Sequence, residues 1–351
     1  MLSRVAESLY WLSRYVERAE NTARMLDVNL QLTLDSDHSA QGSERLDWQP
    51  ILATLEDLTV FTDHYPAITA ETVCDFVTFS RANPNSIWSC IAAARENART
   101  VREYISSEMW EQLNRLWLWL DSAADQDRSG ALNIDFYRHV VDRSHQFQGT
   151  TDATLTHADG WDFIHFGKFL ERADNSSRIL DLKYHILLPK GERVGGDVDT
   201  IQWQAVLKSC SAFEAYRKVY TGQVTPARVA EFIILHDHFP RSIRFCIDAL
   251  TTSLHRISGC DRTHFSNEAE RLAGRLTSDL YYTTINEIFR IGLHEYLDRT
   301  QGRLIEIGTA MRDTYCNWRE DSLNNSDSSQ SATGSHQSQS MGTRAQRQTI
   351  A

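Results

Sequence analysis

Two stretches of the chain carry the same combination of carboxylate and guanidinium side chains. Spacings of three and four residues place most of these charges on one face of a helix in each stretch. Carboxylates and arginines in such a stripe can pair, and an unpaired arginine presents a planar fork that suits a carboxylate or a phosphate. The residues are Glu17, Arg18, Glu20 and Arg24 in the first stretch, and Glu171, Arg172, Asp174 and Arg178 in the second.

Three roles fit these charges. They can form a polar network between two packed helices, which must be fully paired to be tolerated when buried. They can bind a ligand, or they can lie on a solvated face with intrahelical pairs such as Glu20 and Arg24. The charges recur in both stretches, whereas the neighbouring Tyr15 becomes Phe169. We therefore favour the network, with the two stretches facing each other at the centre of the fold.

A second group of polar residues follows Asn83-Pro84. Three arginines there have the spacing i, i+4, i+7 and predict a local basic strip on a helix. The matching part of the second half holds Thr251-Thr252 and is shorter by about one helical turn. Such asymmetry is typical of a functional site in one half, and the loss of a surface turn explains it equally well. The strip and its neighbours are Asn85, Ser86, Arg95, Glu96, Arg99 and Arg102.

Motifs for metal binding, nucleophilic catalysis and nucleotide binding are missing from the sequence. His236-Asp237-His238 and His294-Glu295 offer ligands, but HExxH and paired Glu-x-x-His motifs do not occur. Ser86 and Ser242 each follow a proline by two residues, where serine ordinarily caps a helix. There is no G-x-S-x-G elbow and no Walker loop. We expect no metal and no cofactor, we do not expect ATP binding by this chain alone, and no catalytic residue is assigned.

The composition limits the classes of partner. Among 351 residues, 36 Lys and Arg against 47 Asp and Glu give a net charge of −11, which argues against a broad nucleic-acid surface. No signal peptide and no apolar run long enough to span a membrane is visible. Six cysteines are scattered without a CxxC pair, which is typical of a reducing compartment. We expect a cytoplasmic protein that binds neither nucleic acid nor membrane.

The elements that position these residues are predicted to be helices throughout. Apolar residues at spacings of three and four predict a first helix from about Leu2 to about Leu34, a loop over 35–47, and another helix over 48–61. Thr69 and Thr225 are expected to cap helices, the latter with Pro226 at the first helical position. A helix is expected near 134–147, with Asp159 as the cap of the helix after it. No segment has the alternating pattern of a strand.

The chain also reads as two related halves. At a shift of 154 residues, seven of eleven positions from Glu17 to Asp27 are identical. At a shift of 156 residues, Pro84, Ser86 and Cys90 recur as Pro240, Ser242 and Cys246. We predict an all-α domain over 1–320, built as a pseudo-twofold bundle from repeats at about 1–120 and 155–280, with closing helices over 281–318. Residues 321–351 are polar, with almost no apolar side chains, and are predicted to be a disordered tail.

Several of these motifs together resemble the bacterial alpha-E family, which is predicted to be all-helical and is named for a Glu-Arg motif. They are the segments 15–24 and 169–178, Asn83 to Ile87, Ala94 to Arg99, and Ser107 to Asn114. The resemblance covers residues 1–318. It implies an association with a circularly permuted ATP-grasp protein, and with a transglutaminase-like peptidase, in peptide or amide ligation. It supplies no catalytic residue.

Two functions follow as hypotheses. In the first, the chain is the helical partner or scaffold of an ATP-grasp amide ligase and does not itself bind ATP. In the second, it is an enzyme or a small-ligand protein that binds a carboxylate or a phosphate at the Glu and Arg residues between the halves. The sequence leaves the question of catalytic activity open.

Overall fold

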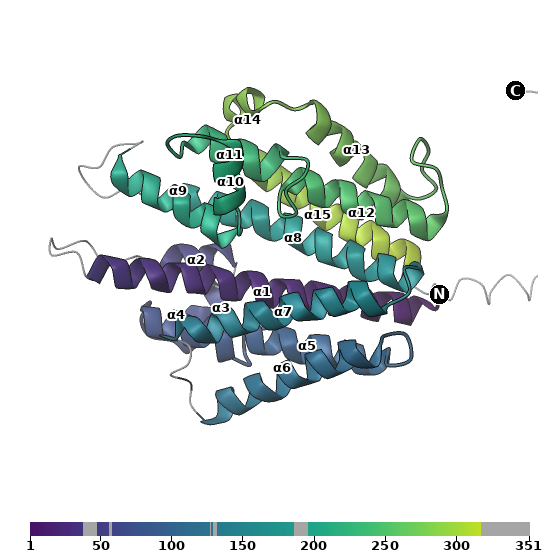
Figure 1. Cartoon of the computed structure of the whole chain (residues 1–351), viewed down its shortest axis with the longest axis horizontal. Helices are drawn as coiled ribbons and strands as arrows, with labels where there is room; N and C mark the ends of the chain where they lie inside the picture. The colour runs from purple at the N-terminus through teal and green to yellow at the C-terminus, as the bar shows by residue number, and fades with distance from the viewer. Residues whose placement is uncertain (38–47, 56–57, 127, 129–131, 186–195, 317–351) are drawn as a thin grey trace, which may run out of the picture. The chain divides into compact units, whose positions relative to one another are not determined.

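The computed structural model describes residues 1–37, 48–55, 58–126, 128, 132–185 and 196–316. Within them the chain forms helices and no strand, so the all-α prediction is confirmed for this part (Figure 1). Residues 1–316 form one compact unit. The tail predicted over 321–351 lies outside the described residues.

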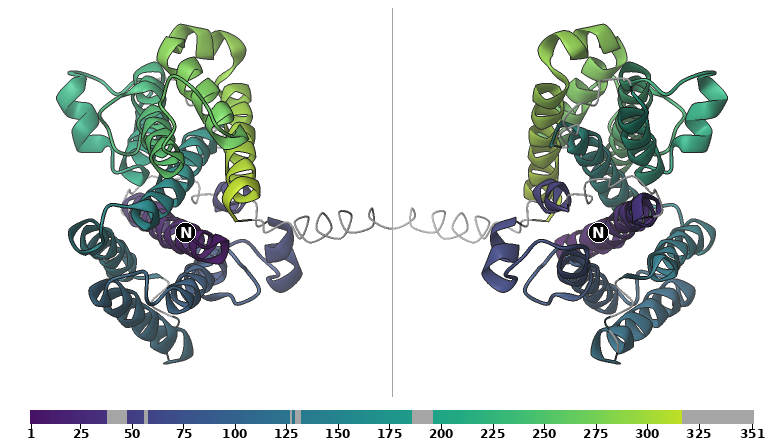
Figure 2. Two further views of the ribbon diagram at one scale, coloured as in Figure 1. Left: turned by 90° about the vertical axis from the view of Figure 1, so that its right-hand side faces the viewer. Right: turned by 90° about the vertical axis from the view of Figure 1, so that its left-hand side faces the viewer.

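Two long helices, α1 (Ser3–Asp37) and α8 (Asp159–His185), pack along each other at the centre of this unit (Figures 1 and 2). They can approach closely because position 167 is a glycine: a Cβ atom there would lie 2.5 Å from the carbonyl oxygen of Tyr10. Leu9, Leu12 and Leu26 of the predicted α1 stripe are fully buried. The paired helices therefore present their facing polar residues to each other at short range.

Of the helices that precede α8, α5, α6 and α7 pack on one side of this central pair, whereas α2 contacts α8 (Figure 2). α5 lies against α1, α6 lies against α5, and α7 closes the group by contacting both α6 and α1. Their bounds are α2 Gln49–Thr54, α3 Leu58–His64, α4 Ala70–Phe79, α5 Ile87–Thr100, α6 Ser107–Gln126 and α7 Ile134–Thr154.

The helices that follow α8 pack on the other side with the same set of contacts. α12 lies against α8, α13 lies against α12, and α15 contacts both α13 and α8. Within the described residues, α7 and α15 thus close their groups in equivalent ways. The duplication and its pseudo-twofold axis stay predictions. The bounds are α9 Asp197–Ser209, α10 Phe213–Val219, α11 Pro226–Leu235, α12 Ile243–Ser258, α13 Glu268–Tyr282, α14 Ile285–Ile291 and α15 Leu293–Tyr315.

Hydroxyl caps fix the starts of several helices. The Thr72 amide donates to Thr69 Oγ1 at the start of α4, at 3.2 Å. Ser86 caps α5 and Ser242 caps α12 in the same way. These three side chains satisfy amides that have no partner within the helix. Thr225 stands at the N-cap position of α11 and Pro226 opens the helix, as predicted, but the Thr225 side chain makes no capping hydrogen bond.

Several helix boundaries differ from the prediction, among them the end of α7, which lies at Thr154 and not near residue 147. α1 continues to Asp37, beyond the expected end at Leu34. The single helix expected over 48–61 is two short helices: α2 opens with Pro50 in its first turn and ends at Thr54, and α3 begins at Leu58. Asp159 is the first residue of α8 rather than its cap. Within the described residues, no helix is long and apolar enough to cross a membrane.

Candidate functional site

The two Glu-Arg pairs of α1 and α8 bind each other reciprocally. Arg172 donates from Nε and Nη2 to the two carboxylate oxygens of Glu17, at 2.7 and 2.9 Å. Arg18 donates in the same way to Glu171, at 2.7 and 3.2 Å. Each pair is the bidentate fork that makes arginine the preferred partner of a buried carboxylate. We call this contact, with Glu20, Arg24, Asp174 and Arg178, the charged seam.

On one side of the seam, a further arginine binds both glutamates of α1. Arg241, which precedes α12, donates to Glu17 at 3.0 Å and to both oxygens of Glu20 at 2.8 and 2.9 Å. Arg24 also pairs with Glu20, and His145 of α7 lies 3.2 Å from it. Burial by itself raises the pKa of Glu17, but Arg172 and Arg241 hold it well below its usual range. Glu17 is therefore charged, and both carboxylates are paired with arginines.

On the other side, Glu171 is held by two arginines of α1. Arg14 Nε lies 2.7 Å from Glu171 Oε2, and Arg18 approaches the same carboxylate and donates to Asn85 Oδ1 at 2.7 Å. Burial raises the pKa of Glu171, but Arg18 and Arg14 outweigh it and lower that pKa to about 2. Asn85 stands at the position that corresponds in sequence to Arg241.

Because Asn85 stands where the other half has Arg241, the two sides of the charged seam are unequal. Asp174 corresponds to Glu20, and Arg178 donates to its Oδ2 at 2.8 Å. Its Oδ1 is buried and accepts no hydrogen bond. Burial accordingly raises the pKa of Asp174. Glu20 has a second arginine, Arg241, as a partner. Asp174 instead has the short amide side chain of Asn85 and unfilled space beside it.

Two adjoining cavities, of about 180 and about 130 Å³, occupy this space. Arg18, Asp174 and Arg178 line both, and Arg14 and Arg312 line the larger one. Four arginines therefore surround two carboxylates, Glu171 and Asp174. Since one water takes up about 30 Å³ of liquid, the space admits several waters or a small anion. We call it the arginine cavity.

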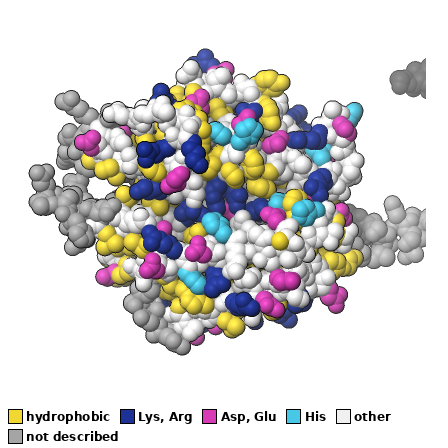
Figure 3. Space-filling view, in the orientation of Figure 1, with side chains coloured by type: hydrophobic (Ala, Val, Ile, Leu, Met, Phe, Trp, Pro, Cys, Tyr) yellow, Lys and Arg dark blue, Asp and Glu magenta, His cyan; other side chains and the backbone are white. Residues whose placement is uncertain are grey.

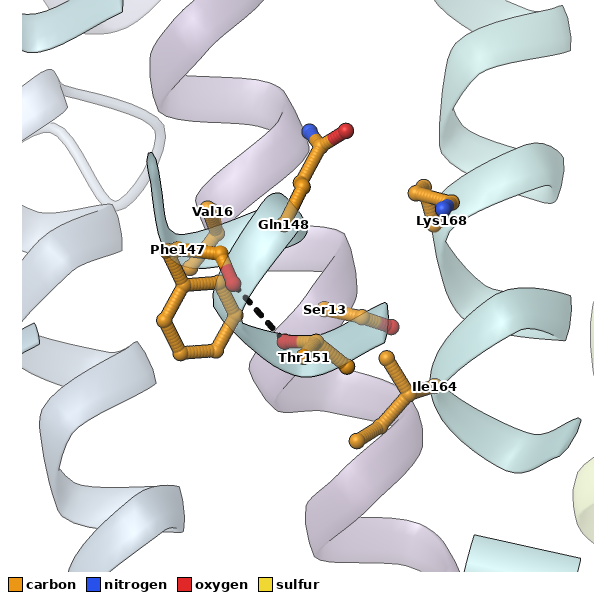
Figure 4. Close-up of a pocket in the computed structure, with 7 residues that line it drawn as sticks. All are labelled: Ser13, Val16, Phe147, Gln148, Thr151, Ile164 and Lys168. Atoms are coloured by element: carbon orange, nitrogen blue, oxygen red, sulfur yellow. Dashed lines mark hydrogen bonds between the residues drawn. The ribbon is translucent and has the colours of Figure 1, made fainter. Parts of the chain in front are cut away.

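Among the residues that the structure describes, the opposite side of the seam is more tightly packed. Lys and Arg side chains gather near the middle of the face in Figure 3. Between α1, α7 and α8, Figure 4 shows Gln148 and Lys168 beside a cavity of about 10 Å³, enough for a single water. Burial, with Arg172 nearby, lowers the pKa of Lys168 to about 8. This side is a packed cluster rather than a pocket.

The three arginines of the predicted basic strip differ in their contacts, although Arg95 and Arg102 both lie over the Trp110 ring. Arg95 lies over the Trp110 ring at 5.6 Å and donates to Asn114, whereas Arg99 is exposed and pairs with Glu96. α5 ends at Thr100, so Arg102 lies beyond the helix that was expected to carry all three arginines, and that expectation is wrong. Ser86 caps α5, and Asn85 instead joins the seam.

Sequence reasoning missed several residues of the site. Arg241 and Arg312 come from elements far from α1 and α8 along the chain, and Gln148 of α7 donates to Glu17 at 2.9 Å. The sequence did contain one signal for further members of the site: Arg14 and Lys168, at matched positions of the two stretches, are both basic. His294, considered as a metal ligand, lies 2.8 Å from Asp181.

Residues 1–316 match the Alpha-E family, described as a predicted alpha-helical domain with a conserved ER motif. The chain belongs to the Alpha-E family. The reciprocal contact between Glu17-Arg18 and Glu171-Arg172 shows what two Glu-Arg motifs do in this Alpha-E chain: each glutamate is bound by the arginine of the other motif.

Similar curated proteins are known from mycobacteria. The uncharacterised protein Mb2597 of Mycobacterium bovis is 23% identical over 295 residues, which cover 79% of this chain and 32% of that protein. The uncharacterised proteins MT2643 and Rv2567 of Mycobacterium tuberculosis are 23% and 22% identical over the same length. The chain therefore spans about a third of the curated relatives it matches. No solved structure matches it.

Proposed function

We propose that this Alpha-E chain is the helical partner of an ATP-grasp amide ligase, in a cytoplasmic system that can include a transglutaminase-like peptidase. The observation that carries the proposal is the length of the relatives: the matched region makes up 32% of the M. bovis protein. An Alpha-E region that is one part of a longer polypeptide is placed to act together with its neighbours. The family resemblance supplies the class of partner.

An exposed apolar surface supports a contact of this kind. Tyr282 at the end of α13 is 84% exposed, and Tyr281, Phe289 and Ile291 lie within ten residues of it with 43 to 49% of their surface exposed. Grouped aromatic and aliphatic side chains on a surface are typical of protein interfaces. We assign this surface to the ATP-grasp protein.

Co-expression with an ATP-grasp protein from the same genome tests the proposal. A stable complex is expected on size exclusion, and Tyr282→Ser with Phe289→Ser should weaken it, since both side chains would lose buried apolar area. Ile201→Ser is the matched control, because Ile201 is 50% exposed on α9. Absence of a complex at micromolar concentration would contradict the proposal, and equal weakening by Ile201→Ser would contradict the assigned surface.

A second candidate function is the binding of a small carboxylate or phosphate in the arginine cavity. It is favoured by the excess of four arginines over two carboxylates around the cavity. Arg312 is the informative residue: it lies over the Trp11 ring and, within the described residues, pairs with no carboxylate. Its loss should therefore affect an anion more than the fold.

Calorimetric titration with inorganic phosphate and with glutarate tests this second function. Binding is expected for the native chain and should weaken in Arg312→Gln, while Arg99→Gln, which removes an exposed arginine, leaves it unchanged. If neither anion binds, or if both variants respond alike, the cavity is a packing defect of the seam and not a ligand site.

A further inference from the structure

Three side chains with metal-binding chemistry meet at the junction of α12 and α13, far from the charged seam in sequence. They are His255 near the end of α12, Cys260 in the connecting loop and Glu270 in the first turn of α13. One potential ligand atom from each lies within 4.8 Å of the other two. Within the described residues, this is the one such group of His, Cys, Asp or Glu.

We propose that His255, Cys260 and Glu270 form a binding site for Zn²⁺. The proposal goes beyond the partner function and does not depend on it. A thiolate, an imidazole and a carboxylate are the three protein groups that zinc takes as ligands, with a fourth position left for water. Mg²⁺ and Ca²⁺ prefer oxygen ligands alone, so a site that contains a sulfur and a nitrogen selects against them.

The local backbone brings the three ligands together. Gly259 ends α12 with a left-handed φ of 72°, a conformation that glycine adopts without strain, and this turn places Cys260 back beside the last turn of the helix. The Cys260 amide donates to Ser258 Oγ at 3.0 Å. Asn267 caps α13 and so fixes the start of the helix that carries Glu270.

The neighbours of the ligands resemble the outer contacts of a metal centre. His255 Nδ1 lies 3.2 Å from the carbonyl oxygen of Cys260, which favours a proton on Nδ1 and leaves Nε2 as the ligand atom. Ser266 and Asn267 donate to the carboxylate of Glu270 and orient it. Metal-binding imidazoles and carboxylates are usually held by such second contacts.

Burial and exposure also suit a site that a metal can enter. His255 and Glu270 are buried, with 7% and 1% of their surface exposed, whereas Cys260 is the only one of the six cysteines that is not buried. The thiol can therefore reach solvent and accept the ion. Binding replaces the S–H bond by a Zn–S bond and releases that proton to water, so the affinity should rise with pH.

The ion would add a cross-link between α12 and α13, which already pack against each other, at the loop that joins them. Asn267 also donates to the hydroxyl of Tyr315, near the end of α15, at 3.0 Å. The site therefore stands at a corner shared by α12, α13 and α15. In the first half, Trp110 occupies the position that corresponds to Glu270, and Arg95 packs over it. The sequence thus provides this site in the second half alone.

Titration of the chelator-treated full chain with Co²⁺ tests the proposal, because a cobalt–thiolate bond gives a charge-transfer absorption that free Co²⁺ lacks. We expect one equivalent to bind, the absorption to disappear in Cys260→Ser, and Zn²⁺ to displace the cobalt. His255→Gln and Glu270→Gln should weaken binding by about 100-fold or more, since loss of a group that merely orients a ligand costs about 10- to 100-fold. His236→Gln and Cys316→Ser are the controls and should bind as the native chain does.

Thermal unfolding with and without Zn²⁺ gives a second measurement that keeps the test decisive if the buried His255 variant fails to fold. Zn²⁺ should raise the Tm of the native chain and leave that of Cys260→Ser unchanged. Absence of the charge-transfer absorption, its persistence in Cys260→Ser, or an equal Tm shift in both proteins would overturn the site and reduce the cluster to a cap of α13.

Discussion

Each central glutamate of the charged seam is held by arginines that it does not share with the other glutamate. Glu171 depends on Arg14 and Arg18, and Glu17 depends on Arg172 and Arg241. A buried pair contributes little over an apolar pair of the same shape, but the loss of one partner leaves an uncompensated charge in a poor solvent. Single substitutions in the seam should therefore be far more damaging than those of exposed pairs.

Glu171→Gln should lower the free energy of unfolding by about 3–5 kcal/mol, since it removes a buried carboxylate and leaves the half-buried Arg14 and Arg18 without this partner. The control is Glu96→Gln, which breaks the exposed pair with Arg99 and should change stability by less than about 1 kcal/mol. Urea unfolding of both variants measures the difference. Similar losses in the two would show that the seam is more hydrated than its burial indicates.

Lys168 destabilises the folded chain, because burial lowers its pKa in the folded state from the ordinary 10.5 to about 8. Between these values the unfolded chain holds the proton and the folded chain does not, so this group makes stability rise with pH. Below about pH 8 both states are protonated and the full cost of burying the charge remains, at most about 3 kcal/mol.

Lys168→Met should therefore stabilise the fold near pH 7 by up to about 3 kcal/mol, and the gain should shrink as the pH rises towards about 10. Comparison of urea unfolding for the native chain and the variant at several pH values in this window measures the effect, since the other titrating groups cancel in the difference. A gain that does not depend on pH would assign the effect to packing and not to charge.

At the scale of the elements, the seam requires that α1 and α8 lie close enough for their side chains to meet. Gly167 makes this possible: a Cβ there would stand 2.3 Å from Ser13 Oγ and 2.5 Å from the Tyr10 carbonyl oxygen. The serine side chain can rotate away, but the backbone oxygen cannot. Position 167 is matched by Ser13 in α1, so the small side chains face each other where the helices are closest.

Gly167→Ala should destabilise the fold by about 1–3 kcal/mol, as overpacking in a well-filled core does. Gly149→Ala, at an exposed site of α7 with nothing near the added methyl, should instead stabilise by about 0.5–1 kcal/mol through helix propensity. Thermal unfolding of the two variants and the native chain measures both effects. If Gly167→Ala behaves as Gly149→Ala does, the helices are free to separate, and close approach is not what the glycine provides.

At the scale of the molecule, the two groups of helices share their buried charges. Arg241 belongs to the second group but binds Glu17 and Glu20 of α1, and Arg14 of α1 binds Glu171 of α8. Separation of the groups would expose the apolar faces of both long helices and leave these charges without partners. The described unit should therefore unfold as a whole.

Fragments 1–155 and 156–316 should each fail to fold alone, and the intact chain should show a single transition. Circular dichroism during heating measures both expectations, with residues 1–316 as the control. The fragments should regain helicity on mixing, because the charges of each match those of the other. A cooperative transition in either fragment by itself would show that the halves are independent and merely abut.

The sequence by itself determined what depends on neighbours along the chain. Spacings of three and four predicted the helices, Thr69, Ser86 and Ser242 marked helix starts, and the Glu-Arg stripes of α1 and α8 were visible as matched stretches. Such features depend on backbone geometry within a few residues, so they can be read without the fold. The interruption between α2 and α3 was missed, because the apolar spacing does not show where a short helix stops.

Only the tertiary structure decided which charges meet. Periodicity places Glu17 and Glu20 on one face, but it cannot say that Arg172 binds the first or that Arg241 reaches both. It also cannot show that Asn85, in the place of Arg241, leaves a cavity beside Asp174, or that His255 and Glu270 converge on Cys260. These contacts join residues far apart along the chain, and their geometry exists only once the helices have packed.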